Sequence, residues 1–331
     1  MNRTVRFHKT GGPEVLRLED VPDPVPGQGE VLIRTRALGL NRAESMFRGG
    51  DYGVDPVFPS GIGYEASGEI EALGAGVTGL AAGDKVSIVP AFAMTDYVVH
   101  GELVVAPAHA VVIHPESLSW EEAASVWMMF ITAYGGLVDL AGLRAGETVL
   151  IPAASSSVGI AAIQIARMVG ARPVALTRTS AKRQPLLDAG ADAVIATTEE
   201  DVVARVRDLT DGAGVRVIFD PVGGPALADL VAAAAPGATI VLYGRLDSEP
   251  APLDVGAVLF KRLTIRGYEL FEITLDEARR RKAVDFVRTG LAEGHLTAVI
   301  DATFPLDAVV DAHRHLEAGG QVGKVVVTVP R

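Results

Sequence analysis

The residues best suited to chemistry by type and spacing form a short turn of small and hydroxyl-bearing side chains. Residues 148–151, TVLI, have the length and apolar character of a strand, and residues 153–157, AASSS, follow as a turn. An almost wholly apolar helix is expected from Val158 and Gly159 to residue 169. In a strand, turn and helix of this kind, the free N–H groups at the helix N-terminus can bind a phosphate.

The turn departs from the usual dinucleotide-binding fingerprint, G-x-G-x-x-G. Its three glycine positions hold Ala154, Ser156 and Gly159, so only the glycine that lets helix and strand pack closely is present. The small residues still allow a pyrophosphate to approach the backbone, and the hydroxyls of Ser155, Ser156 and Ser157 can donate hydrogen bonds to it. A serine-rich turn is also an ordinary helix N-cap. The pattern alone leaves both interpretations open.

A run of cations and hydroxyls follows the next expected strand, residues 173–176. NAD-binding enzymes usually place an Asp or Glu there, about 20 residues after the turn, to bind the ribose 2′-hydroxyl. Residues 177–183, TRTSAKR, contain three cations, three hydroxyls and no carboxylate, which suits the 2′-phosphate of NADPH because a carboxylate would repel it. Thr177, Arg178 and Lys182 are therefore candidate cofactor contacts, unless the run is only the solvated start of a helix.

The rest of this region alternates strand-like and helix-like segments, which predicts a parallel, doubly wound sheet. Further strands are expected at residues 193–196, 215–220, 239–244 and 263–267, with helices such as 198–209 and 225–235 between them. Ligands of such sheets bind at the carboxyl ends of the strands. Because residues 220–224 and 243–246 lie at such ends, Tyr243 and Gly244 are expected on the rim of a cofactor groove.

Residues 1 to about 125 have the pattern of a β-rich region instead. Short strands are expected at residues 31–37, 67–72, 85–89 and 96–99, separated by glycine-containing turns. This spacing predicts a small barrel. Ser119 is a typical N-cap for a helix that leads into the nucleotide-binding region. Near the end of the chain, helices are expected at residues 275–290 and 307–316, and a strand at 324–329 that returns to the first domain.

Composition narrows the possible functions. The chain has 331 residues, more than one core usually holds, so two domains are expected. Its formal net charge of −11 argues against nucleic acid or an anionic membrane surface as a partner. It has no cysteine, and therefore neither disulfides nor cysteine-ligated zinc. Without an uninterrupted apolar stretch of about 18 residues or a signal-peptide core, a cytoplasmic protein is expected.

Motifs spread over nearly the whole chain are similar to those of a known family. They are residues 11–15 (GGPEV), 40–44 (LNRAE), 48–52 (RGGDY), 61–68 (GIGYEASG), 83–86 (GDKV), 132–134 (TAY) and 323–326 (GKVV). The chain resembles the zinc-independent medium-chain dehydrogenases/reductases, in the branch of the NADPH:quinone oxidoreductases (zeta-crystallin-like). The resemblance implies an α/β fold, with a Rossmann-type domain at residues 127–270 and a GroES-like β-barrel domain at residues 1–126 and 271–331.

The departures from the zinc-dependent relatives concern the metal. Those relatives have a His-Glu pair where this chain has Tyr64 and Glu65, and cysteines that are absent here. His313 and His315 are two positions apart in an expected helix, so they point to different faces and form no metal clamp. No metal site is expected. With no metal to position, Glu65 is expected to hold the structure of the barrel rather than to do acid–base work.

Zinc-free chemistry favours a conjugated acceptor. Without a Lewis acid, the reduction of an isolated ketone needs another strong electrophilic group in the site. Hydride transfer to a quinone or an α,β-unsaturated carbonyl instead leaves its charge on an oxygen that a few hydrogen-bond donors can stabilise. We therefore expect an NADPH-dependent oxidoreductase acting on such small molecules. An enoyl-thioester reductase and a non-catalytic NADPH-binding protein remain alternatives.

The resemblance also implies roles for single residues. Tyr52 matches a tyrosine of the substrate site and is a candidate proton donor or oxyanion partner, or else a loop tyrosine that packs. Asn41 matches an asparagine near nicotinamide and substrate, or else it closes a turn. Thr132 and Lys324 match positions beside the nicotinamide and its ribose; otherwise they are a helix hydroxyl and a surface lysine. The family implies a homodimer, for which the sheet edge at residues 263–267 could pair with a partner strand.

Overall fold

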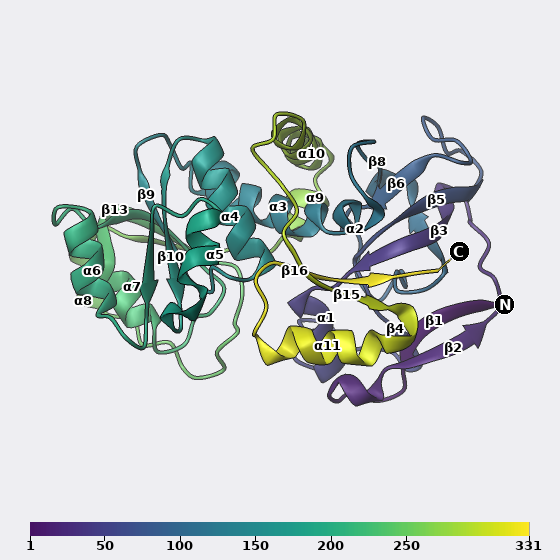
Figure 1. Cartoon of the computed structure of the whole chain (residues 1–331), viewed down its shortest axis with the longest axis horizontal. Helices are drawn as coiled ribbons and strands as arrows, with labels where there is room; N and C mark the ends of the chain where they lie inside the picture. The colour runs from purple at the N-terminus through teal and green to yellow at the C-terminus, as the bar shows by residue number, and fades with distance from the viewer. Residues whose placement is uncertain (331) are drawn as a thin grey trace. The chain divides into compact units, whose positions relative to one another are not determined.

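A computed structural model describes residues 1–330 of the chain, which divide into two compact units. The first unit contains Met1–Met128 and Ala298–Arg331, and the second contains Met129–Thr297. Both ends of the chain therefore belong to the first unit (Figure 1).

The second unit contains a six-stranded sheet in which every neighbouring pair of strands is parallel. Its strands are β9 (Thr148–Ile151), β10 (Arg172–Thr177), β11 (Ala193–Ala196), β12 (Val215–Asp220), β13 (Ala234–Leu242) and β14 (Thr264–Gly267). The order β11-β10-β9-β12-β13-β14 reverses its direction of growth at β9. The expected doubly wound sheet is confirmed, and its switch point lies beside β9, where ligands of such sheets bind.

Helices cover both faces of this sheet. They are α4 (Ser157–Met168), α5 (Arg183–Asp188), α6 (Val202–Leu209), α7 (Leu227–Ala233) and α8 (Val255–Lys261), followed by α9 (Phe271–Thr274) and α10 (Glu277–Ala292). Figure 1 shows α4 and α5 on one side of β9 and β10, and α6, α7 and α8 on the other. The second group packs through a cluster of buried Leu, Val, Ile and Ala side chains that includes Val206, Leu230 and Ile240.

Most expected elements of this unit lie within two residues of the observed bounds, but one helix and one strand begin further from the expected residue. The helix expected at 198–209 begins only at Val202, because the carboxylate of Asp201 accepts the N–H of Ala204 (2.9 Å) and caps it there. The strand expected at 239–244 already begins at Ala234 and ends at Leu242, so Tyr243 and Gly244 follow the strand rather than ending it.

Residues 271–297 pack in the second unit, whereas the sequence places them in the other domain. The ring of Phe286 in α10 lies 4.8 Å from that of Tyr134, and Thr297 donates its N–H to the side chain of Gln164 (2.8 Å). The apolar face of α10 thus finds its partners in α3 (Val126–Tyr134) and α4. The domain bounds expected from the sequence, with residues 127–270 as one domain and the rest as the other, stay a prediction.

The first unit contains two sheets, the larger of which is built around β3. Its strands are β1 (Asn2–Phe7), β2 (Arg17–Val21), β3 (Glu30–Gly39), β4 (Ser60–Gly61), β5 (Glu65–Leu73), β6 (Lys85–Ile88), β7 (Leu103–Pro107), β8 (Val111–Ile113), β15 (Ile300–Pro305) and β16 (Lys324–Thr328). One sheet has the order β2-β1-β4, and the other has the order β15-β16-β3-β5-β6-β8, with β7 also paired to β3. The last strand therefore returns to the first unit, as expected.

The strand expected at 96–99 is wrong, because Asp96 donates its N–H to Ala93 (3.0 Å) and the chain turns there. The helices of this unit are α1 (Arg42–Gly49), α2 (Trp120–Ala123), capped by Ser119 as expected, and α11 (Val309–Ala318).

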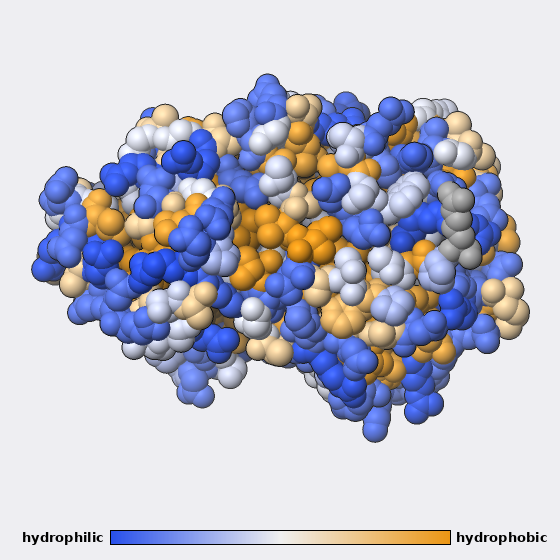
Figure 2. All heavy atoms as spheres, in the orientation of Figure 1, coloured by the Kyte–Doolittle hydropathy of each residue, from blue (hydrophilic) through white to orange (hydrophobic). Residues whose placement is uncertain are grey.

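Short helical segments of other types occur in both units. Short 3₁₀ turns lie at Pro13–Val15, Ala108–Ala110, Ser180–Lys182 and Leu306–Ala308, and a π-helical segment lies at Gly135–Leu140. On the face in Figure 2, hydrophilic residues cover most of each unit.

One helical run, Trp120–Leu140, is long and apolar enough to cross a membrane by length and composition alone. In the structure, 78% of its apolar window is buried, including the side chains of Trp127, Phe130 and Leu137. A buried core helix passes the same test, so the run is weak support for a membrane span.

Gly39, at the end of β3, has no room for a side chain. A Cβ there would lie 2.0 Å from the Ala124 carbonyl oxygen and 3.0 Å from Glu65 Oε2. We expect Gly39→Ala to lower the free energy of unfolding by about 1–3 kcal/mol, because backbone must shift to admit the methyl group. Urea denaturation measures this. Gly49→Ala is the control, since nothing lies within 4 Å of its Cβ; equal stability of the two variants would contradict the prediction.

Candidate functional site

The turn between β9 and α4 is tightly packed, and this explains its one glycine. Ser156 is the N-cap of α4, and its Oγ accepts the N–H of Gly159 (3.1 Å). A Cβ at Gly159 would lie 2.5 Å from the Ala154 carbonyl oxygen. The capping interpretation therefore holds for Ser156. Ser155, Ser157 and Val158 remain half-buried at the start of the helix, where free N–H groups favour an anion.

The basic run after β10 reaches this turn. The Lys182 ammonium donates a hydrogen bond to Ser155 Oγ (3.1 Å), although the two residues are 27 positions apart. Arg178 is exposed beyond the end of β10, whereas Thr177 is buried at its last position. The structure thus brings two of the predicted cofactor-binding segments together, because β9 and β10 are parallel neighbours that end at the same edge of the sheet.

A carboxylate that the sequence analysis missed also lies beside the basic run. Glu199 Oε1 accepts the N–H of Ser180 (2.9 Å), and this hydrogen bond is the main cause of the lowered pKa of the Glu199 carboxyl. The run itself contains no carboxylate, but β11 is the parallel neighbour of β10, so the loop after β11 lies beside it. The strand order is the signal that could have located Glu199.

The side chains of Tyr243 and Thr132 both pack within the second unit. The ring of Tyr243 stacks on that of Phe219, with centroids 3.9 Å apart, and burial raises the pKa of its hydroxyl well above the ordinary value. Its side chain therefore packs inside the second unit, and of the expected pair only Gly244 is exposed. Thr132 is a buried residue of α3.

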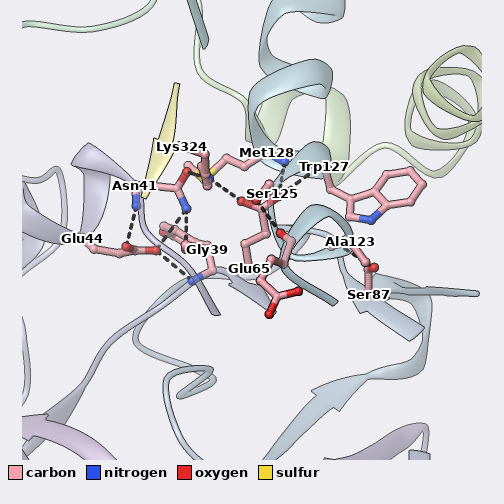
Figure 3. Close-up of polar contacts among 12 residues, drawn as sticks. Gly39, Asn41, Glu44, Glu65, Ser87, Ala123, Ser125, Trp127, Met128 and Lys324 are labelled. Atoms are coloured by element: carbon pink, nitrogen blue, oxygen red, sulfur yellow. Dashed lines mark hydrogen bonds and ion pairs between the residues drawn. The ribbon is translucent and has the colours of Figure 1, made fainter. Parts of the chain in front are cut away.

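In the first unit, Asn41 lies between β3 and α1 as the helix N-cap. Its backbone N–H donates to Glu44 Oε2 (2.7 Å), and its amide nitrogen donates to Gly39 (3.1 Å) and to Glu44 Oε1 (3.2 Å). Figure 3 shows this arrangement. Both amide hydrogens are therefore used within the protein. The turn-closing interpretation of Asn41 fits, whereas a role as a donor to substrate does not.

Lys324, at the start of β16, is a buried lysine and not a surface one. Its ammonium donates to Asn41 Oδ1 and to Glu65 Oε2 (Figure 3), both at 2.6 Å. The exposed fraction of Lys324 is 1%. The other oxygen of Glu65 accepts the N–H groups of Trp127 (2.8 Å) and Met128 (3.0 Å). These contacts fit the structural role expected of Glu65.

The residues at this position do not fit a zinc ion. Glu65 already holds an ammonium ion at 2.6 Å, which would repel a divalent cation. Where zinc-dependent relatives have a histidine, Tyr64 has its hydroxyl 3.3 Å from that of Tyr52. Within residues 1–330, no group of three or more His, Asp or Glu side chains is arranged to hold a metal.

Tyr52 and Tyr64 form a pair of hydroxyls 3.3 Å apart, and the backbone N–H of Tyr64 donates to Glu44, which also accepts from Asn41. Tyr52 lies in the loop after α1, and Tyr64 precedes β5. Burial, followed by the neighbouring Tyr52, raises the pKa of Tyr64. The Tyr64 hydroxyl therefore keeps its proton at neutral pH and remains able to donate a hydrogen bond. Neutral donors of this kind can stabilise an oxygen that gains negative charge.

Similarity to known proteins covers both units. Residues 27–153 match the family model of the alcohol dehydrogenase GroES-like domain, and residues 157–289 match that of zinc-binding dehydrogenases. The chain is 32% identical over 331 residues to human quinone oxidoreductase, covering 98% of this chain and 97% of the relative. The chain belongs to the quinone oxidoreductase family. It is therefore an oxidoreductase of the medium-chain dehydrogenase/reductase type, with the expected Rossmann and GroES-like folds.

Solved structures agree with this membership. Quinone oxidoreductase of Escherichia coli, solved with NADPH, has a TM-score of 0.90 and 28% identity, covering 99% of this chain and all of the relative (100%). A protein described as an NAD-dependent alcohol dehydrogenase also has a TM-score of 0.90, with 32% identity and coverage of 99% and 100%. The descriptions of these two structures name different cofactors, so the choice of cofactor rests on this chain's own residues.

The ion pair of Lys324 and Glu65 allows a direct test of its importance. We expect Lys324→Met to lower the free energy of unfolding by about 3–5 kcal/mol, because it leaves a buried carboxylate without a counter-ion. Combining it with Glu65→Gln removes both charges and should recover part of the loss. Urea denaturation of the single and double variants measures both effects. A double variant less stable than Lys324→Met would contradict this account.

Proposed function

We propose that the protein is an NADPH-dependent reductase of quinones or α,β-unsaturated carbonyls that works without a metal. The observation that carries the proposal is the buried Lys324 ammonium. An ammonium has three donors, and within residues 1–330 two of them bind Asn41 and Glu65. The third hydrogen is left for an oxygen of the substrate or of the nicotinamide ribose, as the resemblance suggested for Lys324.

The cofactor part of the proposal rests on the second unit. The N–H groups of Ser157 and Val158 at the start of α4, with the hydroxyls of Ser155 and Ser156, suit a pyrophosphate, and Gly159 keeps this turn tight enough to form the site. The ammonium of Lys182, already at this turn, and the exposed guanidinium of Arg178 suit a 2′-phosphate. Thr177, Thr132, Tyr243 and Gly244 complete the proposed cofactor-binding set. The nicotinamide of bound NADPH would supply the hydride.

The substrate part rests on the first unit. Tyr52 and Tyr64 present hydroxyls that lie 3.3 Å apart, of which that of Tyr64 keeps its proton, and Lys324 presents its ammonium group. An enolate or phenolate oxygen formed by hydride transfer would be stabilised by such donors, and Tyr52 is the proposed proton donor or oxyanion partner. Asn41 would act by holding the Lys324 ammonium in place. A conjugated acceptor suits these donors because it delocalises the negative charge that the hydride brings, so less of that charge has to be stabilised by hydrogen bonds.

Steady-state kinetics test this function. We expect oxidation of NADPH, and much weaker oxidation of NADH, with a quinone, an enone or an enal as acceptor. Arg178→Ala should raise the KM for NADPH by about ten- to a hundredfold and leave that for NADH unchanged, because only NADPH carries the 2′-phosphate. Glu199→Gln should lower the KM for NADPH, because it removes a negative charge beside the phosphate site. Arg207→Ala, on the exposed face of α6, is the control.

Three outcomes would redirect the proposal. Equal use of NADH, unaffected by Arg178→Ala, would show that the basic run is only the start of a helix. Turnover of a crotonyl thioester alone would favour the enoyl-thioester reductase. Tight NADPH binding without oxidation by any acceptor would favour a non-catalytic binding protein.

We also propose a cytoplasmic homodimer formed through the second unit. β14 is an edge strand of the sheet, and the helix before it carries apolar side chains in solvent, with Val255 exposed by 71%, Leu259 by 68% and Phe260 by 81%. A second copy would cover these side chains and could pair with the free strand edge.

Sedimentation analysis tests the dimer. We expect the wild type to sediment as a dimer and Phe260→Glu to shift it to the monomer, because the charge would be buried at the interface. Leu275→Glu is the control, since Leu275 is similarly exposed at 62% but follows α9 rather than lying in α8. A monomeric wild type, or equal effects of both changes, would contradict the proposed interface.

A further inference from the structure

Two buried carboxylates share a single buried ammonium in the first unit. Glu44 and Glu65 have no exposed surface, and Lys324 has 1%. Lys324 contacts Glu65 directly, whereas Glu44 is connected to the ammonium only through Asn41. If both carboxylates are ionised, this set carries one net negative charge in the interior, which is unfavourable. Glu44 is therefore the carboxylate that most readily takes up a proton.

The groups around Glu44 do not supply a second positive charge. Asn41 donates its backbone and amide N–H groups, and Tyr64 donates its backbone N–H to Oε1 (3.2 Å). On the remaining side, His100 Nε2 lies 3.8 Å from Oε1. The charges of Lys324 and Glu65 act on Glu44 from a greater distance and with opposite effects.

His100 is held neutral by its surroundings. It has no exposed surface, and its ring lies so close to Gly63 that a Cβ there would be 2.3 Å from a ring carbon. Burial is the main cause that lowers the pKa of His100 to about 3, although the Gly39 carbonyl favours the protonated form. At neutral pH its imidazole therefore brings no positive charge to Glu44.

Behind His100, α11 contributes a second neutral histidine. The rings of His100 and His313 lie 6.4 Å apart, and burial lowers the pKa of His313 well below its ordinary value. Arg48 faces His313 Nδ1 at 3.3 Å, but its charge is paired with Glu317 at 2.6 Å. The positive charge nearest to this side of the cluster is therefore already neutralised.

These surroundings place the titration of Glu44 near neutrality. Burial raises the pKa of its carboxyl to about 7, against the opposing effects of the Asn41 N–H groups and the Lys324 charge. The geometry gives the reason: the carboxylate has three N–H donors but no cation in contact. The protonated and ionised forms of Glu44 are therefore both accessible under ordinary conditions.

We propose that Glu44 is a positioning residue for the reduction, and that its proton controls the net charge around the Lys324 ammonium. With Glu44 protonated, Lys324 and Glu65 balance each other, and the ammonium can stabilise an oxyanion. With Glu44 ionised, the added negative charge opposes the oxyanion forming on the substrate. Glu44 does not itself transfer the proton that the product takes up. The inference rests on the reductase activity proposed above.

The pH profile of the reaction tests this inference. With saturating NADPH and the preferred acceptor, we expect the kcat/KM of the wild type to fall by about tenfold from pH 6 to pH 8.5, as Glu44 loses its proton and a unit charge nearby takes effect. Glu44→Gln cannot ionise, so its profile should be flat over this range, whatever its absolute activity. Glu122→Gln is the matched control, because Glu122 has the same capping position in α2 but is not part of this cluster; it should keep the wild-type profile.

A second measurement follows the proton without any substrate. The pKa of Glu44 is higher in the folded protein than the ordinary value of about 4.5, so the folded state binds the proton more tightly. The stability that this contributes is present at low pH and declines between about pH 4.5 and 7. The free energy of unfolding of the wild type should therefore fall with pH relative to Glu44→Gln. Should that variant not fold, Glu44→Asp, which still ionises, should shift the decline in pH rather than abolish it.

The two measurements separate the possible failures. If Glu44→Gln keeps the wild-type decline in kcat/KM, another group titrates and the inference is wrong. If the wild type reduces none of the acceptors, the proposed function is wrong, and the stability measurement decides whether Glu44 binds the proton. If the stabilities of the wild type and Glu44→Gln depend on pH in the same way, that result alone overturns the inference.

Discussion

The structure of the first unit depends on the buried carboxylate of Glu65. It accepts hydrogen bonds from the Lys324 ammonium and from the N–H groups of Trp127 and Met128. A carboxylate without these partners would be too unfavourable to keep ionised in the interior. The pairing therefore ties β5 to the start of α3 and to β16, which lies more than 250 residues further along the chain. It also fixes Asn41, whose side-chain oxygen shares the same ammonium.

Much of the second unit could be predicted from the sequence, because its elements have local signals. The apolar runs of β9 and β10, the small-residue turn and the long apolar helix α4 each identify themselves, and parallel alternation then determines the sheet. The first unit is less regular. β2 (Arg17–Val21) is mixed and largely exposed, so it lacks the pattern of a strand, whereas residues 96–99 have β-forming side chains but follow a turn closed by Ala93.

The candidate site could be predicted only in part, since its residues meet through contacts between distant segments. The motifs pointed to Asn41 and Lys324, but nothing near Lys324 in the sequence indicates a buried ammonium. Its burial results from the pairing of β16 with β3. Glu199 was missed for a similar reason, because it reaches the basic run only through the neighbouring strand β11. Glu44 has an ordinary capping position in the sequence, and the neutral histidines on one side of it come from distant segments, His100 from just before β7 and His313 from α11.

The return of the chain to its first unit has a consequence for synthesis on the ribosome. Translation completes all residues of the second unit, which ends at Thr297, while the first unit still lacks β15, α11 and β16. Until Lys324 emerges, the Glu65 carboxylate has no ammonium beside it, and β3 lacks one of its partner strands. The nascent chain thus carries an incomplete first unit while the second is translated, and the first unit closes only when β16 has been added.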